Sequence, residues 1–96
     1  MELEKLKKMV ELFGTKIGDE YGVEKVEVSF IEKGGGKDHY LLGFKYYMKE
    51  NRQPLGRHQR QFLTKDIVVN FKQILGIELT TLSTSSISKE GKENMY

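Results

Sequence analysis

The chain has 96 residues, of which 38% are hydrophobic and 31% are charged, a composition typical of one small folded domain. It contains no cysteine, which excludes disulfides, thiolate metal sites and cysteine nucleophiles. No apolar run approaches the roughly 20 residues of a membrane-spanning helix, and the first residues lack the basic and apolar regions of a signal peptide. We therefore expect a cytoplasmic protein, located in the host cytoplasm if it is viral, that does not contact a membrane.

Charge is distributed unevenly along the chain, although the net charge is only +2. Residues 1–32 carry five lysines against eight carboxylates, and residues 73–96 carry two lysines against three carboxylates. Residues 33–72 carry nine lysines and arginines against Asp38, Glu50 and Asp66, a net of +6. A basic middle between acidic ends indicates an anionic partner rather than a particular fold.

The N-terminal segment has the spacing of an amphipathic helix, because its apolar residues recur at steps of three and four. These residues are Leu3, Leu6, Val10, Phe13 and Ile17. Gly22 followed by Val23 predicts that the helix stops near Tyr21. Gly14 and Gly18 within it predict either an early end or a close approach to a neighbouring sheet.

From Glu24 the apolar period changes from 3.6 to 2, which predicts two strands joined by the glycine-rich turn at residues 34–36. Their expected buried positions are Val26, Val28 and Phe30 in the first strand and Tyr40, Leu42, Phe44, Tyr46 and Met48 in the second. We expect the first helix to pack against this face of the sheet.

The stretch from Arg57 to Leu63 follows a turn at Pro54 and is interpreted as a short third strand with Phe62 in the core. Thr64 is a suitable N-cap for a second helix, which Gly76 would end. The apolar stripe of this helix consists of Ile67, Phe71 and Ile74. The alternation at residues 77–82 permits a closing strand.

Together these elements predict a single α+β domain of order α-β-β-β-α(-β). It would have a three- to four-stranded, mainly antiparallel sheet covered on one face by two helices. The domain would span residues 1–82, and the polar residues 83–96 would form a flexible C-terminal tail. The order α-β-β-β-α resembles that of double-stranded-RNA-binding domains. The likeness covers topology alone, since the second helix would open with Thr64-Lys65-Asp66 and not with a lysine cluster.

No catalytic constellation emerges from the residues. A phosphate-binding loop at residues 34–37 lacks the strand-to-helix context and the Ser or Thr that should follow Lys37. His39 and His58 have no ligand partners at metal-binding spacing. We therefore expect a protein that is not an enzyme and needs no metal or other cofactor.

The basic stretch is the candidate site. Its expected binding residues, in the region of the second and third strands, are Lys45, Tyr47, Lys49, Arg52, Arg57, His58 and Arg60. Cations beside an aromatic ring on a sheet face can hold phosphates while a base stacks, which favours a small nucleic-acid-binding protein. The structural alternative is that these cations solvate the sheet and protect its edges.

The alternative function is a protein-binding regulator or inhibitor, of the compact kind that phages and mobile elements encode, docking on an acidic protein surface. The sequence leaves the choice between nucleic acid and protein, and the oligomeric state, open.

Overall fold

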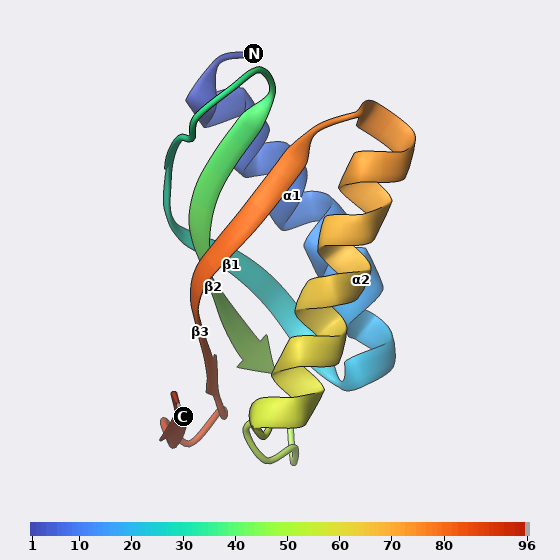
Figure 1. Cartoon of the computed structure of the whole chain (residues 1–96). Coiled ribbons are helices and arrows are strands. Elements are labelled where there is room, and N and C mark those ends of the chain that lie inside the picture. Colours follow the sequence, from blue (N-terminus) through green and yellow to red (C-terminus); the bar gives the residue numbers. More distant parts are fainter. Residues whose placement is uncertain (96) are drawn as a thin grey trace.

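The computed structural model describes residues 1–95, which form two helices packed on one four-stranded sheet (Figure 1). In chain order the elements are α1 (Leu3–Gly18), the short 3-10 helix η1 (Asp19–Tyr21), β1 (Val23–Lys33), β2 (His39–Met48), α2 (Arg57–Leu75), β3 (Glu78–Ile87) and β4 (Glu93–Asn94). Within residues 1–95, neither helix has the length and apolar character that crossing a membrane requires.

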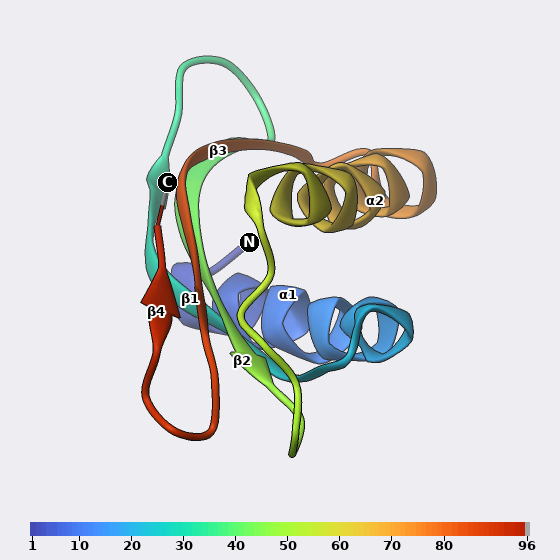
Figure 2. The same cartoon turned by 90° about the horizontal axis from the view of Figure 1, so that it is seen from below.

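The sheet has the strand order β1-β2-β3-β4, and both helices lie on one of its faces (Figure 2). β1 pairs antiparallel with β2, and β3 pairs antiparallel with β4. β2 and β3 are parallel, because α2 connects them as a crossover helix. The domain is therefore α+β with a mixed sheet and the order α-β-β-α-β-β. The predicted order α-β-β-β-α is wrong, and the likeness to double-stranded-RNA-binding domains ends with it.

The core lies between the helices and the inner face of the sheet. Leu6 and Val10 of α1 are fully buried, as the sequence predicted, whereas Phe13 is 40% exposed and packs edge-on against Phe71 of α2. The five predicted residues of β2 are all buried: Tyr40, Leu42, Phe44, Tyr46 and Met48.

Two glycines let α1 lie directly on β1. A Cβ atom at Gly14 would stand 2.9 Å from Cγ1 of Val26, and one at Gly18 would stand 3.0 Å from Cβ of Val23. The close approach that their positions suggested is thus present, and α1 continues as far as Gly18. Gly22 then adopts the left-handed conformation, with φ 79°, and ends the helical segment as predicted.

Both neighbours of β2 are irregular opposite Gly43. The register of β1 shifts between Val28 and Phe30, and that of β3 shifts where Leu42 and Gly43 face Thr81 and Ser83. The extra residue in β1 moves Phe30 to the outer face of the sheet, where it is 39% exposed. The prediction that Phe30 belongs to the core is wrong for this reason.

α2 begins at Arg57, seven residues before the predicted N-cap Thr64, so the predicted third strand at residues 57–63 is wrong. Gly56 is the N-cap, and its backbone N–H donates to Oε1 of Gln59 at 3.0 Å. The buried side of α2 consists of Arg60, Leu63, Ile67 and Phe71. Phe62 faces solvent and is 63% exposed. Gly76 ends the helix with φ 67°, as predicted.

β3 passes through the predicted domain boundary at Leu82 and ends at Ile87. Its second half contains the buried residues Ser85 and Ser86, and Oγ of Ser86 accepts the backbone N–H of Leu55 at 2.8 Å. β4 then adds two residues at the edge, opposite Ser86 and Ile87. The boundary therefore falls inside a strand, while mobility of the last residues stays a prediction.

Candidate binding groove at the edge of the sheet

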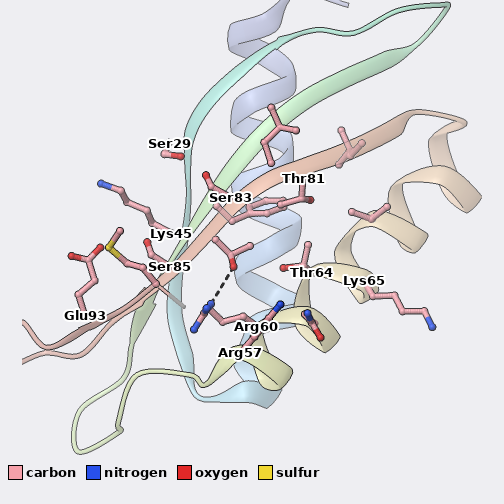
Figure 3. A pocket seen from close by; sticks show the side chains of 17 residues that line it. Ser29, Lys45, Arg57, Arg60, Thr64, Lys65, Thr81, Ser83, Ser85 and Glu93 are labelled. Carbon is pink, nitrogen blue, oxygen red and sulfur yellow. Dashed lines mark hydrogen bonds between the residues drawn. The ribbon is translucent and has the colours of Figure 1, made fainter.

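A cavity of about 1070 Å³ lies between α2 and β3 and continues around the edge of β3 to the outer face of the sheet (Figure 3). The helix wall contains Arg57, Arg60, Gln61, Thr64, Lys65 and Val68. The strand wall contains Leu79 and residues 81–85, and Lys45, Glu93 and Met95 line the far side. We call this cavity the α2–β3 groove.

The helix period explains which side chains reach the α2–β3 groove. Arg57, Gln61 and Lys65 are four residues apart and therefore share one face of α2. This face lies beside the buried stripe that begins with Arg60 and Leu63. The helix wall of the groove is basic because Arg57 and Lys65, the first and last residues of this series, are both cations.

Arg60 is the most constrained cation of the α2–β3 groove, with only 3% of its surface exposed. Its Nε donates to Oγ1 of Thr84 at 3.1 Å, and its Nη1 donates to the carbonyl oxygen of Leu55 at 3.0 Å. Both acceptors are neutral. Burial, followed by the nearby charge of Arg57, lowers the pKa of Arg60 below its ordinary value. A buried guanidinium that lacks an anion is stabilised by any anion that reaches it.

The first turn of α2 adds to this positive potential. It contains no acidic residue, and Gly56 supplies no side-chain cap. Arg57, His58 and Arg60 therefore stand at the end of the helix that carries the positive partial charge. The first free backbone N–H groups of α2 lie in the same turn. Local electrostatics at this turn favour a negative ligand.

Elsewhere in residues 1–95, four lysines form ion pairs with carboxylates; examples are Lys49 with Asp19 and Lys89 with Glu24. None of the four cations of the α2–β3 groove forms such a pair within these residues; they are Lys45, Arg57, Arg60 and Lys65. The single carboxylate among the lining residues is that of Glu93.

Three of the seven predicted site residues line the α2–β3 groove: Lys45, Arg57 and Arg60. Lys49 and Arg52 lie instead in the loop between β2 and α2. There Lys49 pairs with Asp19, and the guanidinium of Arg52 lies beside Gly22. His58 is exposed in the first turn of α2 and is not among the lining residues.

The outer sheet face is less basic than the sequence indicated. Lys45 is the cross-strand partner of Glu27, and the hydroxyl of Tyr47 donates to Oε1 of Glu27 at 3.4 Å. The strand beside Lys45 on its other side is β3, where Ser85 is its partner, because residues 57–63 are helical. The expected pairing of a third-strand arginine with Lys45 and Lys49 is therefore wrong.

Lys65 is a groove residue that was not among the predicted site residues. With Thr64 as the N-cap, Arg57 lies outside the helix, so the sequence gives no reason to group Lys65 with Arg57. The spacing Arg57-Gln61-Lys65 was the available signal, and it becomes visible only once α2 starts at Arg57.

The two long edges of the sheet differ in how they are protected. On β1, Oγ1 of Thr15 accepts the backbone N–H of Val26 at 3.0 Å, and Oε2 of Glu11 accepts that of Val28 at 2.9 Å. On β3, β4 pairs only with Ser86 and Ile87, so residues 79–85 have no strand on their outer side within the described chain. α1 thus blocks one edge, whereas the other borders the α2–β3 groove.

The histidines are not placed as metal ligands. The ring nitrogens of His39 contact the carbonyl oxygen of Gly35 and Oγ1 of Thr80, each at 2.8 Å, which ties the β1–β2 turn to β3. Among residues 1–95, no three His, Cys, Asp or Glu side chains are grouped closely enough to hold a metal ion.

Comparisons with protein-family models, with curated protein sequences and with solved structures gave no match to this chain.

Proposed function

We propose that the protein is a non-enzymatic binding protein that receives an anionic partner in the α2–β3 groove. The observation that carries the proposal is the set of four cations around one cavity, without an ion pair among residues 1–95 and with Arg60 buried on neutral acceptors. An unneutralised buried charge lowers stability, so its position beside an open cavity favours a binding role. Nucleic acid and an acidic protein surface both supply the required charge.

The test compares two charge-reversal pairs that change the net charge equally. Arg57→Glu with Lys65→Glu alters the α2–β3 groove at exposed positions. Lys5→Glu with Lys37→Glu, also at exposed positions, is the matched control on α1 and the β1–β2 turn. Fluorescence anisotropy would follow a labelled oligothymidine and a labelled oligoglutamate peptide at two salt concentrations.

We expect the wild type to bind at least one probe at low salt, with affinity falling as salt rises. The groove pair should bind at least tenfold more weakly, while the control pair should stay close to wild type. If oligothymidine is the ligand, each lost phosphate contact should flatten the salt dependence by roughly 0.7 in log–log slope. Absence of binding to both probes, or equal losses in the two pairs, would contradict the proposal.

A further inference from the structure

We propose that the anionic partner is an extended acidic segment of another protein, which adds as a strand to the free edge of β3 within the α2–β3 groove. This inference rests on the proposed function and specifies its partner.

The backbone of β3 offers the hydrogen bonds. An edge strand presents alternate N–H and C=O groups outward, and such a row is a template for another strand. Residues 79–85 have no strand beside them on this side within the described chain, and no side chain of α2 bonds to their backbone there. The edge of β1 shows the contrast, because Glu11 and Thr15 cover it.

β4 shows that this edge accepts a short strand that contains an acidic residue. Glu93 and Asn94 pair antiparallel with Ile87 and Ser86. The carboxylate of Glu93 already lines the α2–β3 groove. An added segment would occupy the same edge farther along β3, with room for roughly six or seven residues at about 3.3 Å each.

The helix wall selects for charge. Alternate side chains of an added strand point toward α2, where Arg57 and Lys65 stand one helical turn to either side of Gln61. Acidic residues at every second position would meet these cations. On the opposite side, the same segment would meet Lys45 and Met95, which is 54% exposed.

The lining chemistry argues against the other occupants. The only aromatic side chain of the groove wall is Phe44, which is 1% exposed, so no ring is available to stack a nucleobase. A second copy joined through β3 as a continuous sheet would place its own basic α2 on the same face, opposing like charges.

The experiment begins with a displayed library of random twelve-residue peptides, selected on the wild type and counter-selected on the Arg57→Glu/Lys65→Glu pair. The best peptide is synthesised in three forms: unmodified, and N-methylated at alternate backbone amides in each of the two possible registers. N-methylation removes strand hydrogen bonds and leaves the side-chain charges unchanged. Amide hydrogen exchange of the wild-type protein would be measured with and without the unmodified peptide.

We expect proline-poor peptides with acids at alternate positions, a loss of at least tenfold on N-methylation in one of the two registers, and slower exchange within residues 79–85. If both N-methylated forms bind with the same affinity as the unmodified peptide, strand addition is overturned. So would unchanged exchange in β3, or the absence of any peptide that distinguishes wild type from the groove pair. If oligothymidine binds the groove while no peptide is selected, this inference fails and the anion-binding function stands.

Discussion

Replacing Gly43 by alanine tests the irregular centre of the sheet. A Cβ atom there would stand 2.6 Å from Cε1 of Phe30 and 2.7 Å from the hydroxyl oxygens of Ser29 and Ser83. The serine hydroxyls can rotate, but the Phe30 ring must leave the strand surface. That ring is 39% exposed, so roughly 120 Å² of its surface is covered, worth about 3 kcal/mol if all were lost. Because the displaced ring keeps part of its contact, we expect Gly43→Ala to cost about 1–3 kcal/mol.

The assay is a double-mutant cycle followed by urea unfolding. Once Phe30→Ala has removed the ring, Gly43→Ala should cost less than about 1 kcal/mol, since alanine itself restricts the unfolded chain. The difference between the two backgrounds measures the ring-on-glycine contact. The same cost in both backgrounds would refute the reasoning, because it would show that Phe30 does not lie across Gly43.

Three further predictions concern stability. Leu6→Ala should lower the free energy of unfolding by about 2–5 kcal/mol and Phe13→Ala by less, since Leu6 is fully buried and Phe13 is 40% exposed; urea midpoints that rank them in reverse would contradict the packing of α1. The hydrogen bond from the Tyr21 hydroxyl to Asp66, with burial, raises the pKa of Tyr21 from 10.0 to about 12. The stability it contributes is therefore complete below pH 10 and disappears toward pH 12, so the wild type should lose its advantage over Tyr21→Phe in that window of a pH series. Glu11→Ala should leave a β1 amide without its acceptor at a cost of about 1–3 kcal/mol; urea unfolding would measure this cost, and amide exchange unchanged at that one site would contradict the contact.

The parts of the fold that follow simple periodicity were predicted correctly. The stripe of α1 around Leu6 and Val10, the alternation of β2 and the glycine ends at Gly22 and Gly76 all appear where expected. In each case apolar spacing and local backbone preference indicate the same element.

Two of the errors, in the start of α2 and in the second half of β3, arose where a polar residue occupies a buried position. Arg60 occupies the first buried position of α2. Because a charged residue stands where the helical pattern requires an apolar one, the sequence of this segment resembled a strand. Ser85 and Ser86 take buried places in β3 and made its second half resemble a tail. The hydrogen-bond partner of Ser86 is Leu55, which is distant in sequence, so local patterns do not reveal it. The misplaced start of α2 is also why the basic residues were assigned to a sheet face instead of to the α2–β3 groove.

The first turn of α2 has a consequence for how occupancy of the groove can be detected. Arg57 and Arg60 oppose the helix dipole without compensation from an acid in that turn, so the free protein is less stable than its helix length would allow. A ligand that neutralises them relieves this repulsion and raises the melting temperature as it binds. At a ligand concentration 100 times the Kd the gain is about 2.7 kcal/mol, on the order of 10 °C for a domain of this size. Thermal denaturation of the unmodified protein is therefore a label-free screen for its partner.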